Sequence, residues 1–240
     1  MIVVKLGGSV ITEKAREETL DGRSLDRAAD ALAEASDDLV VVHGGGSFGH
    51  HHAADWGVDV DEGTRDADGA LAIHGAMTTL NRFVLDRLRA RDVPALPVHP
   101  LSAASRDAGG ALDLPLSQAA RMLSESFVPV LHGDVVATAG EGVTVLSGDE
   151  IAARVARDLD AERVGLCSTV PGVLDADERV VDRVSSLDDA ALGGSDATDV
   201  TGGMAGKVRT LLDLDAPAHV FDLDGLPAFL AGEAPGTVVD

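Results

Sequence analysis

Three lysines stand out in this sequence because lysine is otherwise absent from it. The chain has 19 basic residues, and only Lys5, Lys14 and Lys207 are lysines. A lysine ammonium is a compact charge on a flexible stem, so it can follow a phosphoryl group as that group moves. We therefore expect these three lysines to have a function, and phosphate chemistry is the function that suits them.

Two glycine-rich segments are a second feature typical of phosphate binding. Gly7 and Gly8 follow one apolar run, and four glycines fall within residues 44–49 after another. Glycine after a buried strand lets backbone N–H groups approach a ligand, and the N-terminus of a following helix adds partial positive charge. If the two loops lie at the same edge of a sheet, they form one anion-binding crevice.

Common phosphate motifs match these loops poorly. A Walker loop ends in Gly-Lys-Ser/Thr, whereas the pair Gly206-Lys207 is followed by Val208 and lacks the first glycine of the motif. Residues 44–49 match the dinucleotide fingerprint G-x-G-x-x-G, but Asp66 and Asp68, at roughly the expected distance, fall where a helix begins. A dinucleotide site is a weak alternative.

A serine hydrolase is a more distant alternative. Residues 45–49 match G-x-S-x-G around Ser47, and Asp199 and His219 could complete the order serine, acid, histidine. In hydrolases of this type the nucleophile and the oxyanion donors lie on different loops, whereas here both patterns overlap on one loop. Replacing Ser47 with alanine would abolish a hydrolase and only weaken a phosphate binder.

Three consecutive histidines, His50, His51 and His52, invite a metal interpretation. Successive residues of a helix point about 100° apart, so three in a row cannot bind one ion together. We expect one of them to be functional and the others to lie on the surface, and we predict no metal site built by protein side chains.

Short β-branched runs alternate with helical patterns, which indicates a largely parallel sheet with helices on its faces. The predicted strands are 2–6, 39–42, 95–98, 128–131, 143–146, 164–167 and 218–221. The predicted helices are 25–35, 67–91, 117–126, 151–159 and 204–214, and 187–203 is predicted as an exposed acidic loop. Ser147 and Glu150 form a capping box at the start of the helix 151–159.

The composition excludes several kinds of partner. A formal charge of −22 repels a phosphate backbone, and five Phe, one Trp and no Tyr provide few surfaces on which bases could stack. No stretch approaches the roughly 20 apolar residues of a membrane span. The single Cys167 makes no internal disulfide, and Lys5 interrupts the N-terminal apolar stretch that a signal peptide needs. We expect a cytoplasmic protein without nucleic-acid or membrane partners, in a cytoplasm of high salt concentration.

Several segments together resemble the amino acid kinase family. They are Lys5-Leu6-Gly7-Gly8-Ser9, Lys14, the loop 44–49, Ser147-Gly148-Asp149 and Gly202-Gly203-Met204-Ala205-Gly206-Lys207, in the family's order and spacing. Within the family, three further segments resemble the isopentenyl phosphate kinases. They are Ile11-Thr12-Glu13-Lys14, Ser-Phe-Gly-His ending at His50, and His132-Gly133-Asp134-Val135-Val136.

The resemblance implies an α/β fold, an open αβα sandwich with a mostly parallel central sheet in one domain over residues 1–240. The lobe of about 1–140 would bind the acceptor, and the lobe of about 141–240 would bind the nucleotide. The implied activity is phosphorylation of isopentenyl phosphate by ATP with Mg²⁺, in an archaeal route to isoprenoids. Dimethylallyl phosphate is a second candidate acceptor, and the implied assembly is a homodimer.

The resemblance also implies residue roles. Lys5 and Lys207 would hold the donor phosphates, and Lys14 would reach the transferring or acceptor phosphate. Asp149 would orient the lysines, and His50 would hydrogen-bond the acceptor phosphate. Further ATP-binding residues would be Gly7, Gly8, Ser9, Gly46, Thr169 and Gly203. Further acceptor-binding residues would be Gly45, Gly49 and Gly133, with Ile73, Met77, Phe83 and leucines of the helix 67–91 as an apolar wall.

One segment departs from the family pattern. Residues 168–173 read Ser-Thr-Val-Pro-Gly-Val where the family has Thr-Asp-x-Asp-Gly-Val, so both carboxylates are missing. Pro171-Gly172 can still form the turn, and the preference for ATP over other nucleotides stays open. Another small-molecule kinase of the same fold, acting on fosfomycin, an amino acid or UMP, is the nearer alternative function.

Overall fold

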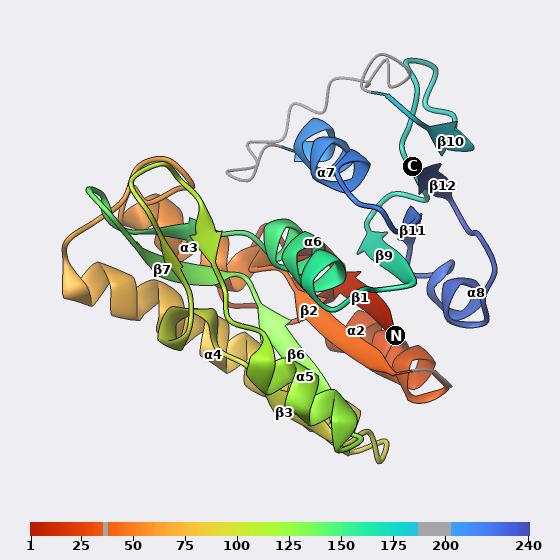
Figure 1. Ribbon diagram of the computed structural model, residues 1–240, viewed down its shortest axis with the longest axis horizontal. Coiled ribbons are helices and arrows are strands. Elements are labelled where there is room, and N and C mark those ends of the chain that lie inside the picture. Colours follow the sequence, from red (N-terminus) through yellow and green to blue (C-terminus); the bar gives the residue numbers. More distant parts are fainter. Residues whose placement is uncertain (36–37, 187–202) are drawn as a thin grey trace.

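A central eight-stranded sheet organises the molecule (Figure 1). The structure is a computed structural model, and it describes residues 1–35, 38–186 and 203–240. The strand order is β10-β12-β11-β9-β1-β2-β6-β3. The strands are β1 (Ile2–Leu6), β2 (Leu39–His43), β3 (Ala95–Pro97), β6 (Val128–His132), β9 (Arg163–Ser168), β10 (Arg183–Val184), β11 (Ala218–Asp222) and β12 (Thr237–Val239). Every neighbouring pair is parallel except β11 and β12.

The strands at the centre of the sheet are covered on both faces. Every residue of β1 and of β2 is buried, which explains why these runs are apolar except for Lys5 and His43 instead of alternating with polar residues. Successive side chains of a strand point to opposite faces, so Val3 packs into one core cluster while Val4 packs into the other. The prediction of a mostly parallel, buried sheet is confirmed.

Helices form a layer on each face of the sheet. On one side lie α2 (Gly22–Ala33), α4 (Ala67–Arg89) and α8 (Leu226–Leu230), and on the other lie α5 (Ser117–Ser124), α6 (Gly148–Asp158) and α7 (Gly203–Leu212). Figure 1 shows α5 and α6 in front of the sheet and α2 behind it. The arrangement is the predicted αβα sandwich.

A second, four-stranded sheet lies beyond the end of β6. Its order is β5-β4-β7-β8, with β5 (Leu112–Asp113), β4 (Ser105–Arg106), β7 (Asp134–Thr138) and β8 (Gly142–Leu146). The chain leaves the central sheet at His132, passes Gly133 and forms the antiparallel β7–β8 hairpin. The predicted strand 143–146 therefore belongs to this smaller sheet, and sequence analysis missed β7. The hairpin packs against α4 and α3 (Gly46–Asp55) through Val135, Ile73 and Ala53.

Most predicted elements end within a few residues of the observed ones. Two helices begin a turn earlier than predicted, α2 at Gly22 instead of residue 25 and α6 at Gly148 instead of residue 151. For α6 the reason is that Ser147 is the N-cap and accepts the Glu150 N–H at 3.1 Å. The Glu150 carboxylate does not complete the predicted capping box, since it makes a bidentate ion pair with Arg106. The short helices α1 (Gly8–Ile11) and η1 (Pro100–Ser102) complete the described elements, and residues 187–202 of the predicted acidic loop lie outside the described residues.

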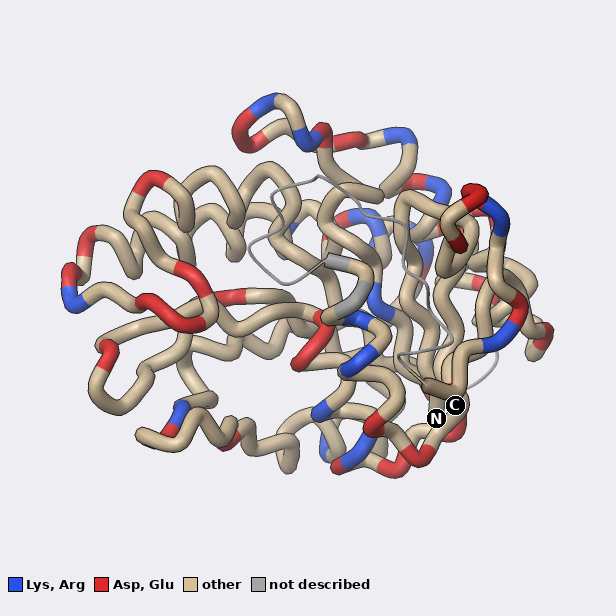
Figure 2. Tube along the Cα trace, turned by 90° about the horizontal axis from the view of Figure 1, so that it is seen from above, with Lys and Arg blue, Asp and Glu red and all other residues tan. Residues whose placement is uncertain are grey.

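The acidic residues are spread around the periphery of the molecule rather than gathered on one face (Figure 2). The formal charge of −22 is therefore distributed over many loops and helix ends. Among the described residues, no helix is long and apolar enough to cross a membrane.

Candidate active site

The carboxyl ends of four neighbouring parallel strands, β9, β1, β2 and β6, meet at one edge of the sheet, where a cavity of about 300 Å³ opens. Open α/β sheets bind ligands at this edge. The cavity lining includes Lys5, Gly7, Gly8, Ser9, Lys14, Gly45, Gly46, Gly49, His50, Gly133, Asp149, Thr169 and Lys207. The structure thus brings together the predicted site residues. Gly203 begins α7 next to Met204, which lines the cavity.

The two glycine-rich loops contact each other directly. A Cβ atom on Gly8 would lie 2.0 Å from the backbone nitrogen of Gly46, so no side chain fits between the loops. Gly46 itself has φ +51°, and a Cβ there would lie 2.1 Å from the Thr12 hydroxyl. Glycine is required at both positions, and the prediction that the two loops form one crevice is confirmed.

Two longer helices begin at the cavity. The first residues of α3 and α6, Gly46 and Gly148, both line it. The first N–H groups of a helix have no partner within the helix, and the aligned peptide dipoles place partial positive charge at that end. The N-cap of α3 is Gly45, which has no side chain to occupy these donors. Both helix ends therefore favour an anionic ligand.

Two lysines share one carboxylate at the floor of the cavity. The Nζ atom of Lys5 lies 2.8 Å from Oδ1 of Asp149, and the Nζ atom of Lys207 lies 3.9 Å from Oδ2. Lys5 is 5% exposed and Asp149 is 9% exposed, so the pair is nearly buried. The contact to Lys5 is an ion pair, because Oδ1 of Asp149 has no well-aligned hydrogen bond. Asp149 can thus hold both ammonium groups toward the cavity.

The other side of the cavity is apolar. Ala53, Ile73, Met77 and Val145 line it next to His50. Ile73 and Met77 were predicted as part of this wall, and the structure confirms their position. Phe83 was predicted there as well, but it packs edge-on against Phe48 at 6.3 Å between ring centroids, within the core between α3 and α4. Leu71, the first leucine of α4, is 61% exposed and points away from the core.

His50 lies in the second turn of α3. The helix begins four residues earlier, at Gly46. The His50 ring lies against Gly45, since a Cβ on Gly45 would lie 3.4 Å from Cδ2 of the ring. The side chain therefore lies next to the N-terminus of α3 and lines the cavity.

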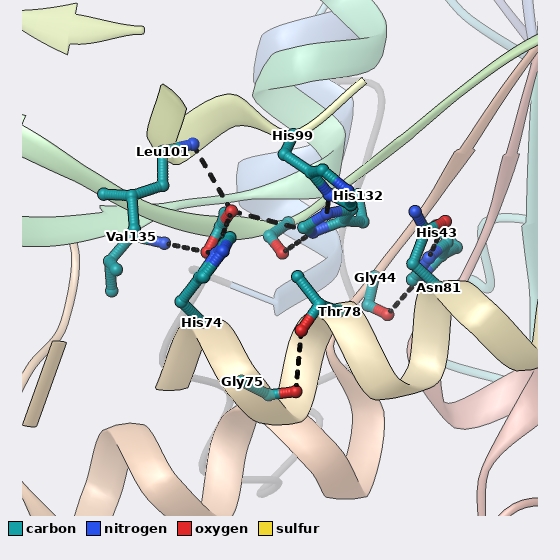
Figure 3. A network of polar contacts seen from close by, with 12 residues as sticks. His43, Gly44, His74, Gly75, Thr78, Asn81, His99, Leu101, His132 and Val135 are labelled. Carbon is teal, nitrogen blue, oxygen red and sulfur yellow. Dashed lines mark hydrogen bonds and ion pairs between the residues drawn. The ribbon is translucent and has the colours of Figure 1, made fainter. Parts of the chain in front are cut away.

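Sequence analysis missed a network of polar contacts that includes His43, His74, Asn81, His99 and His132 (Figure 3). Asp134 lines the cavity, and its carboxylate accepts hydrogen bonds from Nδ1 of His74 at 2.9 Å and from the N–H groups of Leu101 and Val135. The contact with Asp134 raises the pKa of His74. Sequence analysis includes Asp134 only within a family motif. Its position next to a glycine at the end of a strand could have identified it as a site residue.

Four more polar side chains continue this network, and all of them except His99 are buried. The Nδ1 atom of His99 lies 2.9 Å from Nε2 of His132, and the ring of His132 stacks on that of His43 at 5.6 Å. Nε2 of His43 faces the Asn81 amide at 3.1 Å. Burial lowers the pKa of His43 to about 4 and lowers that of His132 well below its ordinary value. Both rings are therefore neutral at physiological pH.

The geometry excludes Ser47 as a hydrolase nucleophile. Its hydroxyl is buried, donates to the Thr19 carbonyl at 3.1 Å and accepts the Thr19 N–H at 3.2 Å. His219, the proposed base, lies on β11, three strands from β2 in the sheet order. Its register partner is Gly165 near the start of β9, so it is far from the carboxyl edge. Asp199, the proposed acid, lies outside the described residues.

The dinucleotide alternative also fails on geometry. Asp66 is the N-cap of α4 and accepts the Asp68 N–H at 2.9 Å, so these residues start a helix and do not follow a strand. The atypical turn after β9 nevertheless borders the cavity through Ser168, Thr169 and Val170. The Val173 N–H donates to the Thr237 hydroxyl at 2.8 Å, which fixes the end of this turn.

The carboxylates at the cavity fit a metal ion carried by a ligand rather than one held by the protein. Among the described residues, no group of three or more His, Cys, Asp or Glu side chains is arranged to hold an ion. Asp149 is paired with lysines, and Asp134 with three hydrogen-bond donors. Mg²⁺ in proteins commonly keeps several waters and binds substrate phosphates with one or two carboxylates. Asp149 is the carboxylate that could contribute to such an ion.

Comparison with known proteins shows the same architecture in one family. The model of the amino acid kinase family matches residues 1–216. An isopentenyl phosphate kinase from Haloferax volcanii is 60% identical over the whole chain and 98% of its own length. One from Methanothermobacter thermautotrophicus is 37% identical over 88% of this chain and 86% of its own.

Solved structures agree with this result. A structure described as an X-ray structure of isopentenyl phosphate kinase covers both chains completely, with a TM-score of 0.87 and 32% sequence identity. The predicted fold class and the predicted family are therefore confirmed. The chain belongs to the amino acid kinase family, and within that family it groups with the isopentenyl phosphate kinases.

Proposed function

We propose that the protein transfers the γ-phosphoryl group of ATP to isopentenyl phosphate and forms isopentenyl diphosphate. The observation that carries this proposal is a single cavity with two unlike sides. One side has Lys5, Lys207 and the N-termini of α3 and α6, and the other is apolar with His50 between them. The 60% identity to the Haloferax volcanii isopentenyl phosphate kinase supports it.

Charge neutralisation is the main task of such a site. Two polyanions must approach in line, and the transferring group carries its charge on three equatorial oxygens. Lys5 and Lys207 hold the donor phosphates in this proposal, and Asp149 keeps both ammonium groups aimed at them. The backbone N–H groups of Gly7, Gly8, Ser9 and Gly46, and those near Thr169 and Gly203, are the remaining donor-side groups. Mg²⁺ would supply additional positive charge when bound with the nucleotide.

The acceptor side needs no general base. A phosphate monoester is already ionised, so its oxygen can attack without losing a proton to the protein. His50 and the backbone groups of Gly45, Gly49 and Gly133 hold the acceptor phosphate, and Lys14 reaches it from the loop after α1. Ile73 and Met77 contact the five-carbon tail, and dimethylallyl phosphate, with a tail of the same size, is a second acceptor.

The two predicted lobes correspond to the acceptor side and the nucleotide side of the site. Residues of about 1–140 supply most of the acceptor side, and residues of about 141–240 supply Asp149, Thr169 and Lys207 of the nucleotide side. A homodimer and a cytoplasmic location are the further parts of the proposal, which the family resemblance supports.

An acceptor panel tests the proposal. The purified protein is assayed in molar KCl for ADP formation with ATP and Mg²⁺ and one of isopentenyl phosphate, dimethylallyl phosphate, fosfomycin, UMP or acetylglutamate. We expect turnover with the first two acceptors, and at least 100-fold lower kcat/KM with the others, because a misfit of acceptor geometry costs on the order of that factor. Turnover with fosfomycin, UMP or acetylglutamate alone would assign a different kinase activity to the same fold.

A further inference from the structure

Two strands end in the same histidine–glycine pair. Nδ1 of His43, at the end of β2, lies 3.1 Å from the carbonyl oxygen of Gly44, and Nδ1 of His132, at the end of β6, lies 2.9 Å from that of Gly133. His43 and His132 are register partners, and both rings are fully buried (Figure 3). Because a carbonyl only accepts hydrogen bonds, each ring must donate from Nδ1.

The carbonyl that His43 holds belongs to the peptide group that carries the Gly45 N–H. A peptide group is planar and trans, so its N–H points opposite to its C=O. Fixing the Gly44 carbonyl against the buried ring therefore fixes the direction of the Gly45 N–H. Gly45 lines the cavity, and its N–H donates no hydrogen bond within the described part of the chain.

We propose that His43 is a positioning residue, which holds the Gly44 carbonyl as the neutral Nδ1–H tautomer and thereby aims the Gly45 N–H at the acceptor phosphate. This inference rests on the proposed function, since it names a residue that acts on the acceptor side of the same cavity. His43 does not line the cavity, so it acts through the peptide group.

Asn81 on α4 sets the tautomer. In the structure, Oδ1 of Asn81 lies 3.1 Å from Nε2 of His43, and Nδ2 of Asn81 is buried without a hydrogen-bond partner among the described residues. The oxygen and the nitrogen of an amide have nearly the same shape, so hydrogen bonding decides which of them faces Nε2. A neutral ring that donates from Nδ1 has a lone pair at Nε2, and Nδ2 of Asn81 supplies the donor that this lone pair needs once the amide is turned by 180°. With the amide oxygen toward Nε2, a neutral ring carries its proton on Nε2 and turns a bare Nδ1 toward the Gly44 carbonyl, and Nδ2 of Asn81 stays buried without a partner among the described residues. The turned amide satisfies one hydrogen bond more.

The pair His132-Gly133 on the neighbouring strand β6 is fixed by the same kind of hydrogen bond. His132 donates from Nδ1 to Gly133, so its Nε2 accepts from Nδ1 of His99, which lies 2.9 Å away. Burial keeps the rings of His43 and His132 uncharged by lowering the pKa of each, and Lys5 lowers that of His43 further. Each ring therefore has one proton, and a neighbouring donor decides which nitrogen carries it.

Two substitutions of His43 test the donor. His43→Leu removes Nδ1, and we expect kcat/KM for isopentenyl phosphate to fall about tenfold to a hundredfold, the scale of a misplaced binding group, while KM for ATP changes less than about twofold. His43→Asn keeps an N–H group near the position of Nδ1 and should restore most of the loss. Val41→Ala on the same strand, in the core and away from the cavity, controls for lowered stability.

A substitution of Asn81 provides a readout that loss of packing would not produce. In Asn81→Asp, the carboxylate accepts from Nε2 and raises the pKa of His43. The ring then donates from both nitrogens at low pH. As pH rises, it loses the Nδ1 proton, because the carboxylate retains the one on Nε2. We therefore expect kcat/KM of this variant to fall between pH 6 and 9 relative to the unsubstituted protein. Lys5, His132 and Asp149, which pairs with Lys5, are unchanged in both proteins.

The outcomes separate this inference from the proposed function. Absence of turnover with isopentenyl phosphate in the unsubstituted protein refutes the proposed function. Turnover there, together with full activity of His43→Leu or parallel pH profiles for Asn81→Asp, refutes the positioning role alone. A ¹⁵N–¹H correlation spectrum of the histidine rings tests the tautomer without any activity. We expect the signals that His43→Asn removes to report a protonated Nδ1, and a protonated Nε2 would overturn the inference.

Discussion

At the scale of single residues, the site depends on how one carboxylate holds two ammonium groups. Lys5 on β1 is buried, and its Nζ atom lies 2.8 Å from Asp149 on α6. Lys207 on α7 approaches the same carboxylate to 3.9 Å. Removing one partner of a buried ion pair leaves the other charge without compensation. Asp149 therefore matters for both the geometry of the lysines and the stability of the cavity floor.

Replacing Asp149 with asparagine tests this arrangement. We expect kcat to fall about a hundredfold, because the lysines are no longer held where charge develops in the transition state. We also expect the free energy of unfolding to fall by about 3 kcal/mol, since Lys5 stays buried without its partner. Steady-state assays and urea denaturation measure the two effects. Asp158→Asn, at the far end of α6 in an exposed pair with Arg154, should leave kcat unchanged. An unchanged kcat in Asp149→Asn contradicts the orienting role.

Sequence analysis predicted the residues whose type is rare or whose spacing is informative. Lys5, Lys14 and Lys207 were identifiable because lysine is scarce, and Asp149 because Ser147-Gly148-Asp149 resembles the family's pattern. His43 was not identified, because a polar residue at the end of an apolar run looks the same whether it faces solvent or donates to the next carbonyl. Only the structure shows which partners surround such a ring.

At the scale of elements, the loop of residues 12–20, which carries Lys14, is attached to the start of α3. Thr12 accepts the Ser47 N–H at 2.9 Å, and Ser47 exchanges two hydrogen bonds with the backbone of Thr19. His52 in the same helix contacts Glu18 at 2.7 Å. Ser47 therefore connects the predicted acceptor-phosphate helix to the predicted acceptor-phosphate lysine.

Replacing Ser47 with alanine should loosen this loop. The substitution removes the hydrogen bonds between the Ser47 hydroxyl and Thr19, each of about 1 kcal/mol, and this loss disturbs the position of Lys14. We therefore expect KM for isopentenyl phosphate to rise about tenfold with a smaller change in kcat. Steady-state kinetics at varied acceptor concentration measure it. Ser124→Ala on the remote helix α5 is the matched control, since its hydroxyl bonds only within that helix. Complete loss of activity in Ser47→Ala would instead point to a direct chemical role for the hydroxyl.

Most elements were predictable because hydrophobic period and helix caps are local signals. The smaller sheet was not, because β4 and β5 have two residues each and β7 follows β6 after the single residue Gly133. Their pairing depends on contacts between distant segments. For the same reason, the sequence predicted the strand 143–146 but not which sheet contains it.

At the scale of the whole molecule, an acidic protein encloses a cavity with concentrated positive charge and a cluster of neutral histidines. The net charge of −22 is spread over the periphery (Figure 2), whereas His43 and His132 are buried beneath the cavity. A buried histidine whose pKa is lowered binds fewer protons in the folded than in the unfolded state. Its contribution to stability is present above pH 6.5 and is lost as pH falls toward the folded-state pKa.

Acid titration tests this linkage. For His43, a shift from 6.5 to about 4 corresponds to about 3 kcal/mol of stability lost between pH 6.5 and pH 4. We expect the free energy of unfolding, measured by urea denaturation at several pH values, to fall more steeply in the unsubstituted protein than in His43→Asn, which cannot take up this proton. Equal slopes over that range would show that His43 does not stay neutral in the folded protein.

The transfer reaction itself is tested most directly by ³¹P NMR of the purified protein with ATP, Mg²⁺ and isopentenyl phosphate. We expect the monophosphate signal of the acceptor to disappear in step with the γ-phosphate of ATP. Two coupled signals of a new diphosphate should take their place, along with those of ADP. Loss of the ATP γ-signal with the acceptor signal intact, or no change in either while another acceptor of the panel is phosphorylated, would contradict the proposed function.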